Sequence, residues 1–154
     1  MSVAAQIIEM AVKRGLLVAT AESCTGGMIS AALTDVPGAS AVLDRGFVTY
    51  TNAAKIEMLG VNAATLEAYG AVSEQVAAEM AIGALGHSDA HRSIAVTGIA
   101  GPGGSDFKPE GRVCFGVASG EGVQTETIDF GALGRASVRR AATDHALELL
   151  LKSL

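Results

Sequence analysis

The sequence is poor in aromatic residues: its 154 residues include no tryptophan, two tyrosines and four phenylalanines. A hydrophobic core must therefore be built from Ala, Val, Ile and Leu. The shortage argues against a single-stranded nucleic-acid platform, on which bases stack against aromatic rings. The chain also lacks a Lys/Arg cluster, and 16 acidic against 11 basic residues give a net charge of −5. We therefore expect no nucleic-acid partner, whereas a small anionic ligand needs only one or two well-placed arginines.

Cysteines and long apolar runs are scarce as well. Two cysteines, Cys24 and Cys114, are too few for a disulfide framework and indicate a reducing compartment. No uninterrupted apolar stretch approaches the about 18 residues of a membrane span. Residues 1–14 lack the layout of a signal peptide. We expect a cytoplasmic protein with no membrane partner, folded as a single domain over residues 1–154.

The hydrophobic pattern alternates between helices and buried strands. Ser2 is expected to cap a first helix that ends at Gly15, and residues 16–21 (LLVATA) are typical of a buried strand. A hairpin near the end makes the sheet mixed. The pattern predicts an α/β fold, a three-layer α/β/α sandwich with a mixed, mostly parallel five-stranded sheet. Further helices are expected at 25–33, 52–59, 62–69, after Ser73 and at 133–152, and further strands at 47–50, 93–97, 113–118 and 123–130.

A run of small and polar residues, AESCTGG at 21–27, follows the first predicted strand and leads into a helix. In open α/β sheets, ligands collect outside the carboxyl ends of strands, and a helix start offers unpaired N–H groups. The Ser23 hydroxyl could therefore attack a carbonyl whose oxyanion is held by neighbouring N–H groups. Gly26 and Gly27 would let a substrate approach the backbone. Spacing alone favours a simpler interpretation, in which Ser23 and Thr25 cap the helix.

Lys55 stands shortly after the second predicted strand, at the end of TYTNAAK (49–55). It falls in the first turn of a helix that we expect Asn52 to cap, where a cation opposes the helix dipole. The dipole together with partial burial would lower the lysine pKa and make a usable general base. Tyr50 could relay a proton or hold the lysine. An ordinary surface lysine is the alternative that the sequence leaves open.

No histidine presents itself as a partner for Ser23. His87 and His91 lie four residues apart, which superficially resembles metal-ligand spacing, but their segment is typical of a solvated turn after a helix. His145 falls mid-helix among alanines. A surface or packing role is favoured for all three. We expect no metal site.

Two further features can hold an anion. The glycine-rich run TGIAGPGG at 97–104 exposes N–H groups, yet it matches neither a phosphate loop nor a dinucleotide fingerprint, and a flexible loop is the default interpretation. Arg135 and Arg139 lie four residues apart on one helical face near a helix start. Paired guanidinium groups there could clamp a phosphate, and a solvated helix face is equally compatible with the spacing.

Taken together, these segments resemble the CinA C-terminal-domain family, the nicotinamide-nucleotide amidases. The resemblance covers essentially the whole chain, and the combination of two of its motifs is specific. It implies an α/β/α domain that hydrolyses the carboxamide of nicotinamide mononucleotide to nicotinate mononucleotide and ammonia, without cofactor or metal. The matching stretches, in the family's order, are AESCTGG (21–27), TYTNAAK (49–55), GAVSEQVA (70–77), TGIAGPGG (97–104) and RASVR (135–139).

The resemblance also implies roles for individual residues. Ser23 corresponds to the nucleophile, Lys55 to its general base and Tyr50 to a supporting catalytic residue. A homo-oligomer, such as a dimer, is what the family suggests. Cys24 is a rival nucleophile, because thiolates are better attackers. The residues expected to surround the substrate are Cys24, Thr25, Gly26, Gly27, Ser73, Thr97, Gly98, Arg135 and Arg139.

Two departures from the family concern the edges of the match. Longer members carry an N-terminal molybdopterin-binding-like domain, so the expectation here concerns the amidase function alone. Residues 109–111 read Pro-Glu-Gly where the family more often has Pro-Val-Gly, at the expected rim of the pocket. Two other functions remain open: a non-catalytic nucleotide-binding or interaction module of the same fold, and hydrolysis of a different small amide.

Overall fold

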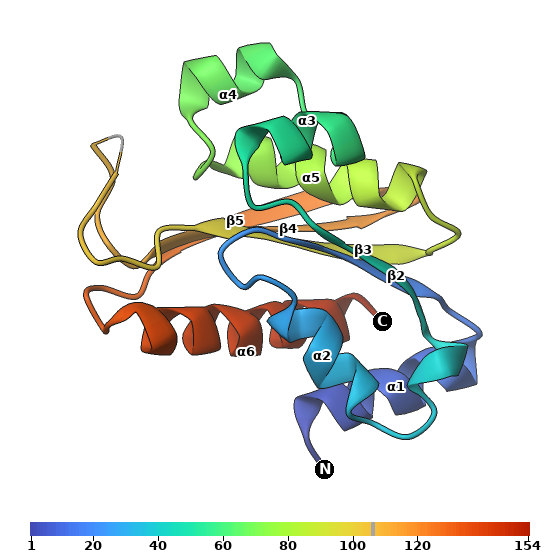
Figure 1. The fold of residues 1–154 in the computed structure, drawn as a ribbon. Coiled ribbons are helices and arrows are strands. Elements are labelled where there is room, and N and C mark those ends of the chain that lie inside the picture. Colours follow the sequence, from blue (N-terminus) through green and yellow to red (C-terminus); the bar gives the residue numbers. More distant parts are fainter. Residues whose placement is uncertain (106) are drawn as a thin grey trace.

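The protein folds in three layers, with helices on both faces of a central sheet (Figure 1). The computed structural model describes residues 1–105 and 107–154. The three-layer α/β/α class expected from the sequence is confirmed. One side of the sheet carries α3 (Asn52–Leu59), α4 (Ala63–Tyr69) and α5 (Glu74–Gly86), and the other carries α1 (Val3–Arg14), α2 (Met28–Thr34) and α6 (Arg135–Ser153).

The sheet has five strands in the order β2-β1-β3-β4-β5. The central strand β1 pairs in parallel with β2 and with β3, whereas β3–β4 and β4–β5 pair antiparallel. The mixed sheet is thus confirmed, although its described pairings are divided equally between the two kinds and are not mostly parallel. The strands are β1 (Val18–Glu22), β2 (Leu43–Val48), β3 (Arg92–Gly98), β4 (Arg112–Ser119) and β5 (Gly122–Asp129).

Local capping rules explain several helix ends. The Ser2 hydroxyl accepts a hydrogen bond from the Ala5 N–H, and Gly15 ends α1 in a left-handed conformation with φ of 65°, both as expected. The expected cap of α3 was wrong by one residue. Thr51, not Asn52, has the extended conformation of a cap, and its hydroxyl accepts from the Ala54 N–H at 3.1 Å.

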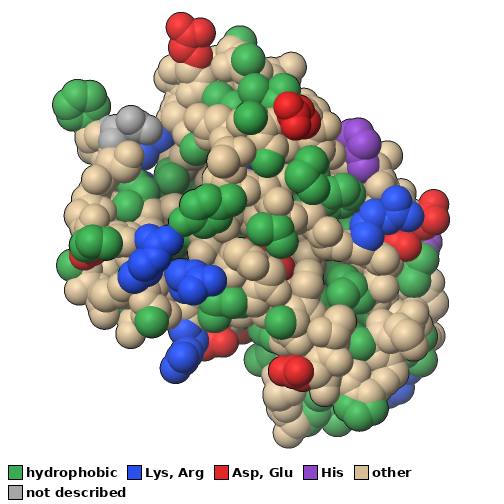
Figure 2. Space-filling view, viewed as in Figure 1, with side chains coloured by type: hydrophobic (Ala, Val, Ile, Leu, Met, Phe, Trp, Pro, Cys, Tyr) green, Lys and Arg blue, Asp and Glu red, His purple; other side chains and the backbone are tan. Residues whose placement is uncertain are grey.

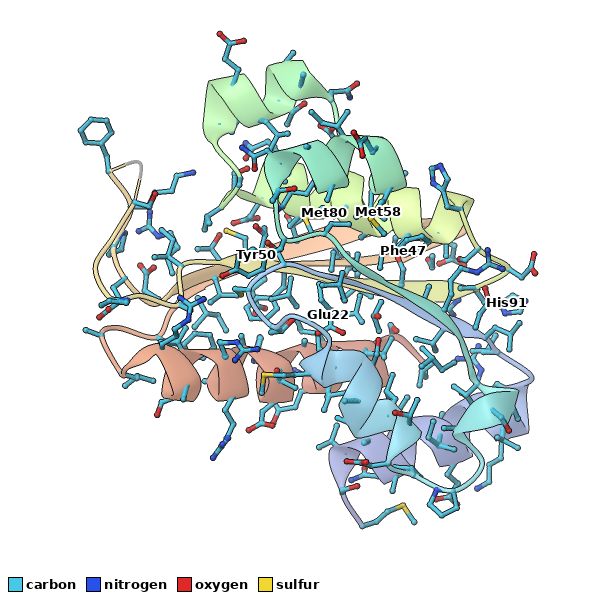
Figure 3. The ribbon with its side chains drawn as sticks, viewed as in Figure 1. Glu22, Phe47, Tyr50, Met58, Met80 and His91 are labelled. Atoms are coloured by element: carbon cyan, nitrogen blue, oxygen red, sulfur yellow. The ribbon has the colours of Figure 1, made fainter. Side chains whose placement is uncertain are left out.

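Small residues allow the layers to approach closely. One cluster of buried side chains packs between the sheet and α1, α2 and α6, and another packs between the sheet and α3, α4 and α5. Met80 of α5 lies against the sheet in the second cluster (Figure 3). A Cβ on Gly83 would lie 1.9 Å from the Leu59 carbonyl oxygen, and one on Gly116 would lie 2.6 Å from that of Ala77. At these positions the backbones of neighbouring elements pack too closely to leave room for a side chain. A core with such close packing has little room for large aromatic rings, which agrees with the low aromatic content.

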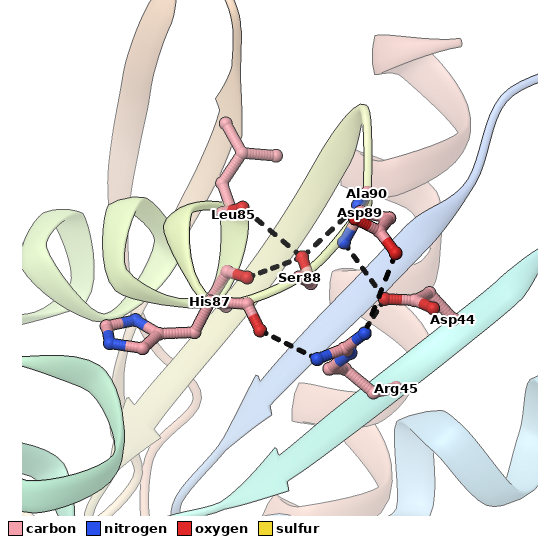
Figure 4. Close-up of polar contacts among 8 residues, drawn as sticks. Asp44, Arg45, Leu85, His87, Ser88, Asp89 and Ala90 are labelled. Carbon is pink, nitrogen blue, oxygen red and sulfur yellow. Dashed lines mark hydrogen bonds and ion pairs between the residues drawn. The ribbon is translucent and has the colours of Figure 1, made fainter.

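The segment after α5 is held to the neighbouring edge strand β2 (Figure 4). Arg45 donates to the His87 carbonyl at 3.0 Å, and the Asp89 N–H donates to the Asp44 carboxylate at 3.1 Å. The Ser88 hydroxyl donates to the Ala84 carbonyl at 2.6 Å. This turn lies at the end of the sheet opposite to the carboxyl ends of β1, β2 and β3.

Each histidine has its own structural contact. His87 Nδ1 meets the Gly83 carbonyl, His91 Nδ1 accepts from the Leu17 N–H, and His145 pairs with Glu126. Over residues 1–105 and 107–154, no three His, Cys, Asp or Glu side chains gather as metal ligands would. Within the same residues, no helix combines the length and the apolar character that crossing a membrane requires.

Candidate active site

The parallel strands β1, β2 and β3 bring three sequence motifs to one edge of the sheet, because their carboxyl ends lie side by side (Figure 1). Ser23 follows β1, Tyr50 and Lys55 follow β2, and Thr97 lies at the end of β3. A cavity of about 320 Å³ opens at this edge. Its described lining comprises Ser23, Cys24, Tyr50, Asn52, Lys55, Ala71, Val72, residues 97–105, Lys108 and Arg135.

Lys55 and Ser23 are directly hydrogen-bonded at the bottom of this cavity. Lys55 Nζ donates to Ser23 Oγ at 2.9 Å, and the two residues are only 1% and 7% exposed. Two main-chain carbonyls complete the surroundings of the amine, that of Thr49 at 2.9 Å and that of Tyr50 at 3.3 Å. The arrangement satisfies the geometric requirement for a base that removes a proton from a hydroxyl.

Burial makes Lys55 a usable base. Loss of hydration lowers its pKa from 10.5 to about 8, an effect offset only slightly by the neighbouring Cys24. Lys55 also lies in the first turn of α3, where the helix dipole disfavours a cation. Among the described residues, no carboxylate lies within 4 Å of its amine. The amine is therefore neutral in about a tenth of molecules at pH 7 and in about half of them at pH 8.

A buried carboxylate that the sequence analysis did not single out supports the turn at residues 23–27, which carries Ser23 and is called the serine turn below. Glu22 Oε1 accepts from the Thr25 hydroxyl at 2.6 Å and from the N–H groups of Gly27 and Ile29. Its Oε2 accepts from the Ser30 N–H at 3.0 Å. Figure 3 shows Glu22 between the sheet and the start of α2. The sequence signal that could have identified Glu22 is its position just before a helix start, where the helix dipole favours an acidic side chain.

These contacts correct the expected helix over 25–33, because α2 begins only at Met28. Residues 23–27 form a turn in which Gly26 and Gly27 have φ of 58° and 110°. Glu22 accepts hydrogen bonds from N–H groups at the start of α2, which have no partner within the helix itself. Neither glycine lines the cavity, and the Thr25 hydroxyl points to Glu22 instead.

The other expected substrate-binding residues divide into two groups. Cys24, Thr97, Gly98 and Arg135 line the cavity, whereas Ser73 does not: its hydroxyl caps α5 by accepting from the Val76 N–H. A Cβ on Gly98 would lie 2.8 Å from the Val113 side chain and 3.1 Å from the Cys24 sulfur. Glycine at 98 is therefore favoured by the close approach of β4 and of the Cys24 side chain to the end of β3.

Tyr50 meets its neighbours through two different groups. Its main-chain carbonyl accepts from Lys55, while its phenol oxygen accepts from Arg135 Nη2 at 2.7 Å. Tyr50, which is labelled in Figure 3, lines the cavity and is 57% exposed. Arg135 Nη1 also donates to the Gly101 carbonyl at 2.6 Å. The pair joins the loop after β2 to the glycine-rich loop after β3.

Positive charge gathers around the cavity although the chain is acidic overall. Figure 2 shows basic side chains together around the beginning of α6. Lys108, which sequence analysis missed, lines the cavity and donates to the carbonyls of Tyr69 and Val72. The described lining residues include no Asp or Glu. The cavity is thus built to receive a molecule that carries negative charge.

Arg139 lies behind the serine turn, and it is absent from the described cavity lining. Its Nε donates to the Cys24 carbonyl at 2.9 Å, and its Nη2 approaches the Thr25 carbonyl at 3.3 Å. Arg135 and Arg139 share a helical face, but only Arg135 reaches the cavity. Glu110, the residue that departs from the family pattern, accepts from the Gly103 N–H at 2.7 Å and braces the glycine-rich loop.

Comparisons with known proteins agree with this architecture. A family model described as the CinA C-terminal domain matches residues 1–154. Nicotinamide-nucleotide amidohydrolase PncC of Escherichia coli (strain K12) is 48% identical over 153 residues, covering 97% of this chain and 92% of that protein. The protein of the same name from Enterobacter agglomerans is 52% identical, covering 90% and 85%.

A solved structure of similar fold comes from Agrobacterium tumefaciens, a competence/damage inducible protein. It has a TM-score of 0.94 and 51% identity, covering 97% of this chain and 92% of that one. Some relatives are much longer. The chain spans 35% of a CinA-like protein of Chlorobium phaeobacteroides (strain BS1), to which it is 51% identical over 147 residues. Because the family model covers its full length, the chain belongs to the CinA C-terminal domain family.

Proposed function

We propose that this protein is a nicotinamide-nucleotide amidohydrolase, which hydrolyses the carboxamide of nicotinamide mononucleotide to nicotinate mononucleotide and ammonia. The observation that carries the proposal is the buried hydrogen bond between Lys55 Nζ and Ser23 Oγ inside a cationic cavity. Relatives that bear this name are 48% and 52% identical over most of their length. That identity supports the same reaction here.

In the first half of the reaction, Ser23 Oγ attacks the carboxamide carbon. The carbon–oxygen bond forms as the neutral Lys55 amine accepts the hydroxyl proton, and the carbonyl oxygen becomes an oxyanion. Lys55 then returns the proton to the amide nitrogen. The carbon–nitrogen bond breaks, ammonia leaves, and an ester links the nicotinoyl group to Ser23.

Water completes the cycle on the same base. Lys55 accepts a proton from the water that attacks the ester carbon, and a second oxyanion forms. Collapse of this intermediate expels Ser23 Oγ, which takes the proton back from Lys55. The carboxylic acid that forms gives its remaining proton to the released ammonia or to solvent and becomes a carboxylate, and the dyad returns to its starting state.

The substrate's phosphate explains the positive cavity. At the mouth, Arg135 Nη1 and Nη2 each use one N–H on Gly101 and Tyr50 and keep a second, and Lys108 stands in the loop on another side of the cavity. We assign Arg135 to the phosphate because a guanidinium group can offer paired hydrogen bonds to phosphate oxygens. Tyr50 positions Arg135 through its phenol and Lys55 through its carbonyl.

Cys24 is a poor nucleophile in this site. Burial raises its thiol pKa to about 11, and its own backbone N–H, Arg139 and Lys55 offset that effect only partly. A thiol with this pKa carries very little thiolate near neutral pH. Ser23, which contacts the base directly, is the better assignment.

The proposal extends to the protein's setting. We propose that residues 1–154 act as one amidase domain in the cytoplasm, as a homo-oligomer such as a dimer, and without cofactor, nucleic acid or membrane partner. The absence of disulfides between the two buried cysteines is compatible with a reducing compartment. Light scattering on the purified protein reports the oligomeric state directly.

Ammonia release from purified protein tests the function. Nicotinamide mononucleotide, nicotinamide riboside and nicotinamide are compared side by side, with nicotinate products followed by chromatography. We expect turnover of the mononucleotide and its loss in Ser23→Ala. Binding without ammonia release would contradict the proposal and favour a nucleotide-binding module. Full activity in Ser23→Ala would overturn the assigned nucleophile.

A further inference from the structure

The peptide groups of the serine turn are held from behind by Arg139. Its Nε donates to the Cys24 carbonyl at 2.9 Å and its Nη2 to the Thr25 carbonyl at 3.3 Å. Arg139 comes from α6, 114 or more residues away along the chain. Within residues 1–105 and 107–154, no carboxylate pairs with it. Its charge is therefore directed to the turn.

Cys24 is the residue of this turn, besides Ser23, that lines the cavity, and its N–H donates to no other described residue, whereas Thr25 is fully buried away from the cavity. The N–H groups of Ser23, Gly26, Gly27 and Met28 already donate, to the Val96 and Ser23 carbonyls, Glu22 and the Thr25 carbonyl. A donor directly after the nucleophile is well placed for the oxyanion that forms on the attacked carbonyl.

Arg139 is linked to the Cys24 N–H through the peptide groups of the turn. In a trans peptide the C=O and N–H point in opposite directions, so a contact at the carbonyl sets the direction of the N–H in the same peptide. The Thr25 carbonyl faces Arg139, and the Gly26 N–H of that peptide donates to the Ser23 carbonyl at 3.1 Å. The Ser23 carbonyl belongs to the same peptide as the Cys24 N–H.

We propose that Arg139 is a positioning residue that fixes and polarises the oxyanion-binding N–H group of Cys24. It acts on this group through two linked peptides, by way of the Thr25 carbonyl, the Gly26 N–H and the Ser23 carbonyl. Hydrogen bonds in such chains strengthen one another, and a cation at the far end increases the donor strength of the last N–H. Arg139 does not touch substrate. This role rests on the amidase function proposed above.

The role predicts a loss confined to the transition state. The bound amide carries no full negative charge on its carbonyl oxygen, and this charge develops only during the reaction. Arg139→Ala should therefore lower kcat while KM stays near its original value. Removal of a whole oxyanion donor costs about 100- to 1,000-fold in kcat, so weakening one donor should cost about 10-fold.

The experiment measures kcat and KM for nicotinamide mononucleotide in Arg139→Ala, Arg139→Lys and Arg140→Ala. Arg140 is an exposed neighbour on the same helix and is the matched control. We expect Arg139→Lys to lie between the wild type and Arg139→Ala, because an ammonium keeps the charge but not the fork. Added guanidinium should restore part of kcat in Arg139→Ala and none in Ser23→Ala.

Several outcomes would overturn the role. A rise in KM with kcat unchanged would place Arg139 on the substrate, and a kcat within about threefold of wild type would remove it from the reaction. An equal loss in Arg140→Ala would indicate a general effect on α6. If Arg139→Ala does not fold, Arg139→Lys is judged by the same criteria. Failure of the wild type to release ammonia would instead refute the proposed function.

Discussion

The titration of Lys55 gives the sharpest test of the proposed mechanism. Only the neutral amine can accept the Ser23 proton, so kcat/KM should follow the neutral fraction of Lys55 in the free enzyme. Burial lowers the pKa of this lysine from 10.5 to about 8. The reaction should therefore accelerate with rising pH and level off above that value.

The size of the effect follows from the shifted pKa. With a pKa of about 8, the neutral fraction is about 9% at pH 7 and about 91% at pH 9, so kcat/KM should rise about tenfold between them. An unshifted lysine would be neutral in only about 0.03% of molecules at pH 7. Burial thus increases the reactive fraction at pH 7 about 300-fold.

The assay is ammonia release at substrate concentrations well below KM, from pH 6.5 to pH 9.5 at constant ionic strength. The substrate's phosphate titrates at about pH 6, so its titration contributes little to the change of kcat/KM above pH 7. Cys24→Ala is the control, because a thiol with a pKa of about 11 does not titrate in this window. A rate that is independent of pH between 7 and 9, or a midpoint above 10, would refute Lys55 as the base.

Three further predictions concern single side chains. Cys24→Ala should keep ammonia release within about threefold of wild type, and the native thiol should react slowly with a thiol reagent at pH 8, whereas loss of turnover would make Cys24 the nucleophile. Arg135→Ala should raise KM for nicotinamide mononucleotide about 10- to 100-fold without affecting hydrolysis of the riboside, which lacks the phosphate; an equal effect on both substrates would contradict phosphate binding. Glu22→Gln should destabilise the protein by about 1–3 kcal/mol in urea unfolding, because one amide oxygen cannot replace two accepting oxygens, and unchanged stability would show that the turn needs no carboxylate.

Features encoded by neighbouring residues could be predicted from the sequence. Ser2 and Ser73 cap helices by accepting from N–H groups three residues later, so their signal is contained in four consecutive residues. The buried strands β1 and β3 are short apolar runs. The motifs at 21–27, 49–55 and 97–104 follow strands, and parallel pairing of those strands brings the motifs together.

Features that depend on the third dimension were missed. Strand β2 begins at Leu43, not Phe47, because an edge strand with exposed and half-buried residues shows no apolar run. Lys108 reaches the cavity because a loop folds back over the connection between α4 and α5. Glu22 and Arg139 both support the serine turn, and the Arg139 contacts span more than 110 residues. Nothing in local spacing distinguishes Arg139 from Arg135.

The burial of Lys55 cannot be explained by a contribution to the stability of the fold. Burial and the start of a helix both disfavour its charge, and the described residues supply no carboxylate to compensate. Three oxygen atoms accept from its amine, and one of them is the Ser23 hydroxyl, which is not a charge partner. A leucine or methionine could occupy a similar volume without the loss of hydration. A lysine at this position weakens the protonated folded state, and the same effect produces a neutral amine against a serine hydroxyl near pH 8. The burial that lowers the free energy of unfolding of the protonated protein is thus the same burial that lowers the Lys55 pKa and makes its amine a base.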